Sequence, residues 1–388
     1  MPIRNEGIEL SIILPCLNEE KTVGICVRKA QQFLVTHKLN GEIIVADNGS
    51  TDQSAAIARD LGAKVIHVAE KGYGSAIMGG VYAALGTFSI VSDADDSYDL
   101  EHLFPFLEKL RCGIDVVIGN RFRGTIHPGA MPFLHRYFGN PLLSSIGRIL
   151  FHSPVHDFHC GLRGFRTEAF RALPLKTTGM EFASEMIVKS LAFGLRMTEV
   201  PTDLFPDGRG SHSHLHTWRD GWRHLRFMLL HSPRWLFLYP GLLLIVCGIG
   251  FGFWLLPHQQ YVFDIHTLLY CGISIVIGFQ AIVFFLLAKA IAVSLGIIPS
   301  DKLIEWTRRS SLVEVGIITG ILLIIGGLLG SIYAIFEWES RAFGHLNPSH
   351  TLRIVIPSVT CFLLGGQIVF SSFLFGILHI SRKTDGSP

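Results

Sequence analysis

The pattern of hydrophobic and polar positions divides the chain into two parts of different kind. Over residues 1–210, short apolar runs alternate with longer stretches of helical periodicity, which is typical of an α/β fold with a mostly parallel sheet. We expect strands at residues 10–14, 42–46, 64–68, 88–92 and 115–119, and helices between them, for example over residues 21–36 and 54–61. Beyond residue 235 the apolar runs become much longer, and only 15 Asp, Glu, Lys or Arg residues lie there.

Four of the later runs have the length of a membrane-spanning helix, at residues 236–256, 267–288, 312–336 and 354–379. A helix needs about 20 apolar residues to cross a hydrocarbon core of roughly 30 Å. Helices buried in soluble proteins rarely run so far without a charge. We therefore expect a C-terminal α-helical transmembrane domain of four spans over residues 236–388. Two hairpins that enter the membrane only partway are the alternative.

The charges between these runs predict the orientation in the membrane. The loop 257–266 has no Lys or Arg, whereas the loop 299–311 and the C-terminal tail carry Lys302, Arg308, Arg309, Arg382 and Lys383. Basic loops stay on the cytosolic side, and no signal peptide precedes the first strand. We expect an integral membrane protein whose first domain and both termini are cytosolic.

Residues 211–235 form a linker between the two parts, and an amphipathic helix is expected within it. Aromatic and apolar residues recur on one face, and arginines occupy the adjoining face: Trp218, Trp222, Leu225 and Leu229, with Arg219, Arg223 and Arg226. This pattern is typical of a helix that lies in the interface of a lipid bilayer. A buried helix of the first domain is the alternative. Residues 132–151 suggest a second interfacial element.

Composition and charge limit the kinds of partner and the compartment that we expect for this chain. The formal net charge is +2, which gives no reason to expect a nucleic-acid partner. The seven cysteines are scattered without CxxC spacing, so we expect a reduced compartment and no cysteine metal cluster. The sequence leaves open whether the chain forms a homo-oligomer.

Polar clusters follow three of the expected strands, at residues 15–19, 47–50 and 93–95. The carboxyl ends of parallel strands meet at one edge of a sheet, where ligands of α/β proteins bind. Asp93 and Asp95 point the same way because side chains alternate along a strand. Two such carboxylates suit Mg²⁺ or Mn²⁺ carrying a diphosphate, although short acidic pairs also occur on ordinary loops. The chain has no GxGxxG motif and no P-loop lysine.

Taken in order, these clusters resemble the GT-A glycosyltransferases of family 2, and within them the polyprenyl-phosphate (dolichyl-phosphate) hexose synthases. The resemblance covers about residues 8–235 and continues through residues 119–122 and 157–165. It implies that residues 1–210 form a GT-A nucleotide-sugar-binding domain with a Rossmann-like α/β fold.

The resemblance also implies roles for individual residues. The residues Pro15, Leu17 and Glu19 would line the nucleotide pocket, and Asp47 and Asn48 would contact the base and ribose. Lys71 would lie in a Gly-rich turn near the sugar nucleotide. Asp93 and Asp95 would bind or flank the metal. The sequence departs from the family where Asn48 replaces a common Asp and Ser97 a common Gln. The turn at residues 71–76 has a purely structural alternative.

In the family that the chain resembles, the sugar is transferred to a lipid phosphate, and we expect cations to position this acceptor without a base to activate it. A lipid phosphate is already anionic, so it needs no general base, and arginine suits phosphate geometry. The candidates are Arg121, Arg163 and Arg209, with Arg136 less favoured; a surface salt bridge is the alternative for each. Glu181 and Glu185 are either bases for a hydroxyl acceptor or a helix cap and a structural ion pair. For His212, His214 and His216 we expect a loop rather than a Zn²⁺ site.

The function that we expect is the transfer of a hexose, with inversion, from a nucleotide sugar to a polyprenyl or dolichyl phosphate in the bilayer. UDP-glucose is the favoured donor, with Mg²⁺ or Mn²⁺ as cofactor. A processive polysaccharide synthase is one alternative, because residues 231–235 differ by one letter from the QxxRW motif of those enzymes. A non-catalytic subunit of a lipid-carrier transporter is another.

Overall fold

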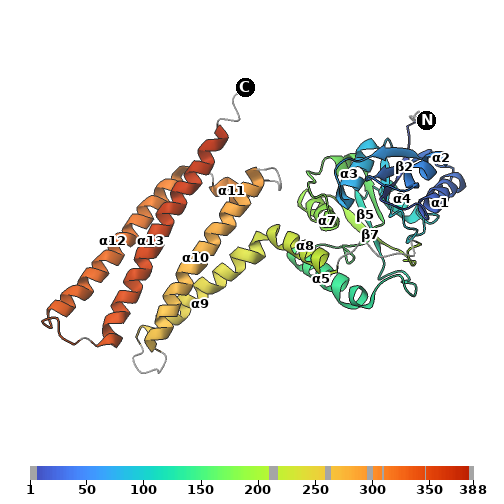
Figure 1. Cartoon of the computed structure of the whole chain (residues 1–388). Helices are drawn as coiled ribbons and strands as arrows, with labels where there is room; N and C mark the ends of the chain where they lie inside the picture. Colours follow the sequence, from blue (N-terminus) through green and yellow to red (C-terminus); the bar gives the residue numbers. More distant parts are fainter. Residues whose placement is uncertain are drawn as a thin grey trace. The chain divides into compact units, whose positions relative to one another are not determined.

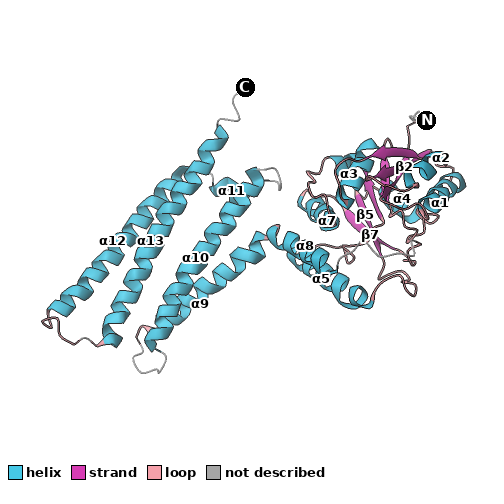
Figure 2. Ribbon diagram, in the orientation of Figure 1, coloured by secondary structure: helices cyan, strands magenta, loops and turns pink. Residues whose placement is uncertain are grey.

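The computed structural model describes residues 7–208, 217–257, 264–294, 300–307, 310–345 and 347–383. They belong to two compact units, Met1–His231 and Ser232–Pro388. The first unit combines a sheet with surrounding helices, and the second is entirely helical in its described part (Figures 1 and 2).

A seven-stranded sheet forms the centre of the first unit, in the order β3-β2-β1-β4-β6-β5-β7. The strands are β1 (Leu10–Cys16), β2 (Gly41–Asp47), β3 (Lys64–His67), β4 (Phe88–Val91), β5 (Val116–Asn120), β6 (Arg163–Arg166) and β7 (Met197–Pro201). Only β6 runs antiparallel to its neighbours, β4 and β5. The apolar residues of β1 are buried because this strand lies between β2 and β4 in the middle of the sheet.

Along the chain, the helices of this unit alternate with the strands, as the polar and apolar pattern predicts, and α8 follows the last strand. They are α1 (Val23–Thr36), α2 (Ser54–Asp60), α3 (Tyr73–Ala83), α4 (Phe104–Arg111), α5 (Asn140–Phe151), α6 (Thr167–Arg171), α7 (Phe182–Ala192) and α8 (Thr217–Leu230), with a π-helical turn η1 (His135–Gly139) before α5. The α/β fold and the five expected strands are confirmed. The sequence pattern does not predict β6 and β7, because charged or proline residues interrupt their apolar runs.

The second unit contains four helices that are long and apolar enough to span a membrane: Arg234–Leu255, Ile265–Ser294, Ser311–Glu339 and Pro348–Leu378. They correspond to η2 (Arg234–Leu238) with α9 (Tyr239–Leu255), α10 (Asp264–Ser294), α12 (Ser310–Glu339) and α13 (Pro348–Lys383), and the short α11 (Lys302–Thr307) follows α10. The four expected helices of membrane-spanning length are therefore confirmed.

These helices pack as two hairpins, α9 with α10 and α12 with α13 (Figure 1). Glycines allow the backbones to approach closely: a Cβ atom at Gly241 would lie 2.8 Å from the carbonyl oxygen of Gly278, and one at Gly320 would lie 2.7 Å from that of Gly365. Arg353 of α13 donates hydrogen bonds to the carbonyl oxygens of Leu255 and Leu256 at the end of α9. The buried arginine thus ties the two hairpins together.

Candidate active site

The three polar clusters lie on one rim of the sheet. They follow β1, β2 and β4, which are adjacent and parallel. The register places Cys16 opposite Asp47, and the backbone N–H of Asn48 donates to the carbonyl oxygen of Cys16 over 2.9 Å. The sheet topology therefore brings together residues that are up to 80 positions apart in the sequence.

Pro15 lies near the end of β1, and Leu17 and Glu19 lie in the turn that follows the strand. Leu17 is exposed on the rim, whereas Glu19 is buried and its Oε2 accepts a hydrogen bond of 3.2 Å from the Thr22 hydroxyl. The backbone N–H of Glu19 donates to Ser54 Oγ over 2.7 Å, which joins this turn to the start of α2.

Asp47 ends β2, and its carboxylate lies beside the neighbouring strand. Its Oδ1 accepts from the backbone N–H of Ser50 over 2.9 Å, and its Oδ2 lies 3.3 Å from Nδ1 of His67 at the end of β3. Burial raises the pKa of Asp47, but the hydrogen bonds from Ser50 and His67 outweigh burial and leave the pKa below its ordinary value. Asp47 is therefore ionised at neutral pH.

Asn48 and Lys71 hold the Gly-rich turn against the end of β2. The Asn48 amide nitrogen donates to the carbonyl oxygens of Val68 and Glu70, over 3.1 and 2.7 Å, and its Oδ1 accepts from the backbone N–H of Gly72 over 2.7 Å. Lys71 Nζ donates to the Asn48 carbonyl oxygen over 2.8 Å. Base recognition by Asn48 stays a prediction, but the side chain also has a local role that the sequence did not indicate.

Asp93 lies between the start of α3 and the turn before β6. Its Oδ1 accepts a hydrogen bond of 2.9 Å from the Tyr73 hydroxyl. A Cβ atom at Gly161 would lie 2.2 Å from Asp93 Oδ2, so only glycine fits there. Burial, followed by the Asp93 charge, raises the pKa of Tyr73 well above its ordinary value, and the hydroxyl stays protonated.

Asp95 and Asp96 are neighbours with different surroundings. Asp95 Oδ1 accepts from the backbone N–H of Ser97 over 3.1 Å and from its hydroxyl over 2.5 Å. Ser97, which replaces the family's Gln, therefore holds the Asp95 carboxylate. The Asp96 carboxylate instead forms an ion pair of 2.7 Å with Lys29 of α1.

The donor set at Asp93 and Asp95 fits a hard divalent cation, because carboxylate oxygens are the ligands that Mg²⁺ and Mn²⁺ prefer. Among the described residues, no group of three or more His, Cys, Asp or Glu side chains is placed to hold a metal ion.

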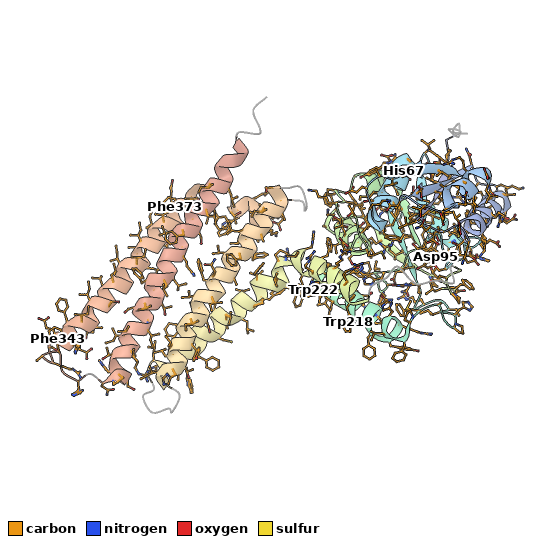
Figure 3. The ribbon with its side chains drawn as sticks, viewed as in Figure 1. His67, Asp95, Trp218, Trp222, Phe343 and Phe373 are labelled. Carbon is orange, nitrogen blue, oxygen red and sulfur yellow. The ribbon has the colours of Figure 1, made fainter. Side chains whose placement is uncertain are left out.

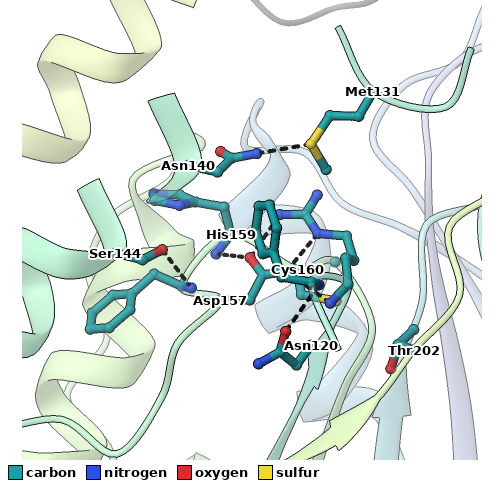
Figure 4. Close-up of polar contacts among 12 residues, drawn as sticks. Asn120, Met131, Asn140, Ser144, Asp157, His159, Cys160 and Thr202 are labelled. Carbon is teal, nitrogen blue, oxygen red and sulfur yellow. Dashed lines mark hydrogen bonds and ion pairs between the residues drawn. The ribbon is translucent and has the colours of Figure 1, made fainter. Parts of the chain in front are cut away.

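Arg121 is paired with Asp157 in the interior. The guanidinium donates from Nε to Oδ2 over 2.7 Å and from Nη2 to Oδ1 over 2.8 Å, and the Asp157 side chain is fully buried. Burial lowers the pKa of Arg121, but the Asp157 charge raises it more, so the pKa lies well above its ordinary value. Figure 4 shows that Asp157 also accepts from the backbone N–H of His159. Arg121 is thus an arginine whose charge is already balanced.

Arg163 is buried, with 2% of its surface exposed. Its guanidinium donates to the carbonyl oxygens of Cys160, Phe158 and Ala183, over 2.7, 2.8 and 2.9 Å. These bonds fasten the segment that contains Asp157 to α7. The placement favours a structural role over the phosphate contact that the sequence suggests.

Arg209, His212, His214 and His216 lie outside the described residues. The backbone N–H of Gly208, immediately before Arg209, donates to the carbonyl oxygen of Asp95 over 2.9 Å. Arg136, in η1, lies over the ring of Tyr137, 5.5 Å from its centroid.

Glu185 takes part in a buried ion pair, which is the structural one of the two roles that the sequence allows for it. It lies 2.6 Å from Lys189 Nζ, and both side chains are almost fully buried. Glu185 Oε2 also accepts from the backbone N–H and the hydroxyl of Thr177, over 2.8 and 2.6 Å. Burial raises the pKa of Glu185, but Lys189 and Thr177 lower it more, and the net pKa is below its ordinary value.

An apolar surface extends over η1, α5 and α8 in the same unit. Trp218 and Trp222 are 84% and 58% exposed (Figure 3), and further exposed side chains are Phe133, Leu134, Tyr137, Phe138, Leu142, Ile149 and Leu230. The opposite side of α8 is covered, since Phe227 and Met228 are buried against Leu143 and Ile146. The helix is therefore partly buried, and membrane contact by its tryptophan face stays a prediction.

The site lies on the rim of an α/β sheet, and the chain continues into four helices that are long and apolar enough to span a membrane. Residues 11–173 match the sequence model of glycosyl transferase family 2, and residues 286–379 match that of the glycosyltransferase family 2 C-terminal transmembrane region. The low-salt glycan biosynthesis hexosyltransferase Agl6 of Haloferax volcanii is 36% identical over 376 residues, which cover 95% of this chain and 89% of that protein. The chain belongs to glycosyltransferase family 2.

Other relatives match little more than half of the chain. A dolichyl-phosphate hexose transferase of Haloferax volcanii is 30% identical over 194 residues, covering 50% of this chain and 81% of that protein. Glucosyl-3-phosphoglycerate synthase from Mycobacterium tuberculosis, solved with Mn²⁺, UDP and glucosyl-3-phosphoglycerate, is 20% identical, with a TM-score of 0.46 over 58% of this chain and 80% of that one.

Proposed function

We propose that this membrane glycosyltransferase moves a hexose, with inversion, from a nucleotide sugar to a polyprenyl or dolichyl phosphate. One observation carries the proposal: the unit that bears the carboxylate rim also exposes the apolar surface of η1, α5 and α8, and membrane-spanning helices follow it in the chain. An enzyme built in this way is suited to an acceptor that stays in the bilayer. The similarity to proteins described as a hexosyltransferase and a dolichyl-phosphate hexose transferase supports it.

The donor would bind along the rim. Pro15, Leu17 and Glu19 would line the nucleotide pocket, and Asp47 would accept hydrogen bonds from the nucleoside. Asp93 and Asp95 would hold Mg²⁺ or Mn²⁺, which when bound neutralises the charge of the departing diphosphate. UDP-glucose is the donor that we propose, on the family resemblance.

The acceptor phosphate would meet arginines. The Nε and Nη2 atoms of Arg121 donate hydrogen bonds to Asp157, and its Nη1 remains available as a donor. Arg209 is a further candidate for this contact, on the family resemblance alone. Arg163 would position the segment 157–160 rather than touch the phosphate. Lipid phosphate needs no base, in keeping with the structural use of Glu185.

The catalytic unit and both termini would face the cytosol, where nucleotide sugars are made. The basic residues of the loop after α10 and of the C-terminal tail support this orientation.

Transfer of radiolabelled sugar tests the function. The full-length protein in lipid nanodiscs would be given Mn²⁺, polyprenyl phosphate and labelled UDP-glucose or a GDP-hexose. We expect label in an organic-extractable lipid that mild acid hydrolyses. Label in a water-soluble polymer would indicate a processive synthase, and no product with any donor would indicate a non-catalytic subunit. Stabilisation by GDP rather than UDP in thermal-shift measurements would overturn the choice of donor.

A further inference from the structure

We propose that Tyr73 is a positioning residue for Asp93, and that its hydroxyl aims the first carboxylate of the Asp93–Asp95 pair at the donor. This inference rests on the proposed function and deepens it. The sequence pattern does not single out Tyr73, which occurs there only as one residue of a Gly-rich turn.

The contact itself is specific. The Tyr73 hydroxyl donates to Asp93 Oδ1 over 2.9 Å, within the ordinary range for such a bond. The ring packs against the hydrophobic core of the first unit, so the side chain has little freedom to leave this position. A phenol beside a metal-binding carboxylate supplies a hydrogen-bond donor without adding charge.

The opposite side of the carboxylate is also confined. A Cβ atom at Gly161 would lie 2.2 Å from Asp93 Oδ2, and the Gly161 backbone N–H donates to the Tyr98 hydroxyl over 2.9 Å. Asp93 is therefore enclosed by α3 on one side and by the turn before β6 on the other. A carboxylate held in this way does not lose rotamer freedom again when it binds a ligand.

The backbone that carries Tyr73 is fixed on both sides. Gly72 has a φ of 135°, and its N–H donates to Asn48 Oδ1. The N–H of Gly74 donates to the carbonyl oxygen of Thr178 over 2.8 Å. A Cβ atom at Gly72 would lie 2.1 Å from that same oxygen, which explains the glycine before the tyrosine. The turn thus sets the direction of one phenol.

Groups that orient a metal ligand from behind typically affect metal affinity or activity by about 10–100-fold. Tyr73→Phe keeps the ring and removes only the donor. We expect apparent Mn²⁺ affinity, measured by calorimetry on the full-length protein with saturating UDP, to fall about tenfold or more. The KM for polyprenyl phosphate should stay unchanged, while the Mn²⁺ dependence of transfer moves to higher concentration.

Tyr82→Phe is the matched control, because Tyr82 lies on the same helix and is exposed. It should leave Mn²⁺ affinity unchanged. A double-mutant cycle with Asp93→Asn separates positioning from general destabilisation: if Tyr73 acts through Asp93, Tyr73→Phe has little further effect on nucleotide binding in the Asp93→Asn background.

The outcomes distinguish the two proposals. Equal Mn²⁺ affinity of Tyr73→Phe and the wild-type protein would overturn the role of Tyr73 and leave the proposed function intact. Additive effects in the cycle would also overturn it. A wild-type protein that binds neither Mn²⁺ with UDP nor Mn²⁺ with GDP would overturn both.

Discussion

At the scale of single residues, Asp95 and Asp96 form a matched pair for testing the donor site. Asp95→Asn should reduce transfer by about a hundredfold or more, because a lost metal ligand removes several kcal/mol of charge stabilisation. The fold should persist, since an amide oxygen can still accept from Ser97. Asp96→Asn, which breaks only the half-exposed pair with Lys29, should retain activity because such pairs contribute about 0–1 kcal/mol. The measurement is lipid product against Mn²⁺ concentration; near-normal turnover by Asp95→Asn would exclude the metal role.

Arg121 forms an ion pair with Asp157 and is also a proposed contact of the acceptor phosphate, and a single substitution cannot separate the structural role from the proposed one. Arg121→Ala leaves Asp157 buried and unpaired, which typically costs about 3–5 kcal/mol of stability, and we expect transfer to be lost as well. The double variant Arg121→Gln with Asp157→Asn removes both charges. Its melting temperature should recover most of the loss, while its activity should not. If activity returned together with stability, Arg121 would have no role beyond the fold.

At the scale of elements, Glu181 and Glu185 lie at the N-terminal end of α7. Their sequence pattern fits either a pair of bases for a hydroxyl acceptor or a helix cap and a structural ion pair. Glu185→Gln breaks the buried pair with Lys189 and weakens the bonds to Thr177, so we expect a loss of about 3–5 kcal/mol in unfolding free energy. Glu181→Gln, at the start of the same helix, is the control and should change stability much less. Denaturant titration of the purified protein measures both.

The pH dependence of stability gives a second test of Glu185. Its folded pKa is lowered, so its contribution to stability is fully present above the pKa of the unfolded chain and is lost as pH falls through the folded pKa. Over the range from neutral to acid pH, the Glu185→Gln variant should therefore lose less stability than the wild-type protein. An identical acid dependence in both proteins would contradict the ion pair.

The exposed face of α8 predicts an effect on the acceptor alone. Replacing Trp218 and Trp222 by Ser removes two aromatic side chains that suit the membrane interface. We expect a higher KM for polyprenyl phosphate in nanodiscs and an unchanged KM for the nucleotide sugar. Replacing the buried Phe227 instead should lower stability. A changed donor KM in the tryptophan variant would place this face at the nucleotide pocket.

At the scale of the whole molecule, the orientation in the membrane is open to a chemical test. Cys112 is exposed in the first unit, whereas the other cysteines are buried or half-buried. A membrane-impermeant maleimide should label the protein in inverted vesicles and not in intact cells, and Cys112→Ser should remove most of the label. Labelling in intact cells would place the catalytic unit outside.

The sequence by itself determined the features that depend on local pattern. Strands β1 to β5 and the four spans follow from apolar runs of different length, because burial in a parallel sheet and in a bilayer both demand continuous apolar residues. The gathering of the clusters after β1, β2 and β4 follows from the same pattern, since parallel neighbours end at one edge. The motifs were enough to assign the family.

Tertiary structure alone decided which polar groups meet. The antiparallel β6 inserts between β4 and β5, and its pairing partners come from distant parts of the chain. The partners of Arg121, Arg163 and Glu185 are likewise set by packing, so a charged residue that looks available in the sequence is already neutralised or hydrogen-bonded in the fold. Burial forces this outcome, because a charge removed from water must find a partner. The contact between Tyr73 and Asp93 arises in the same way, from two segments that only the folded sheet brings within hydrogen-bonding distance.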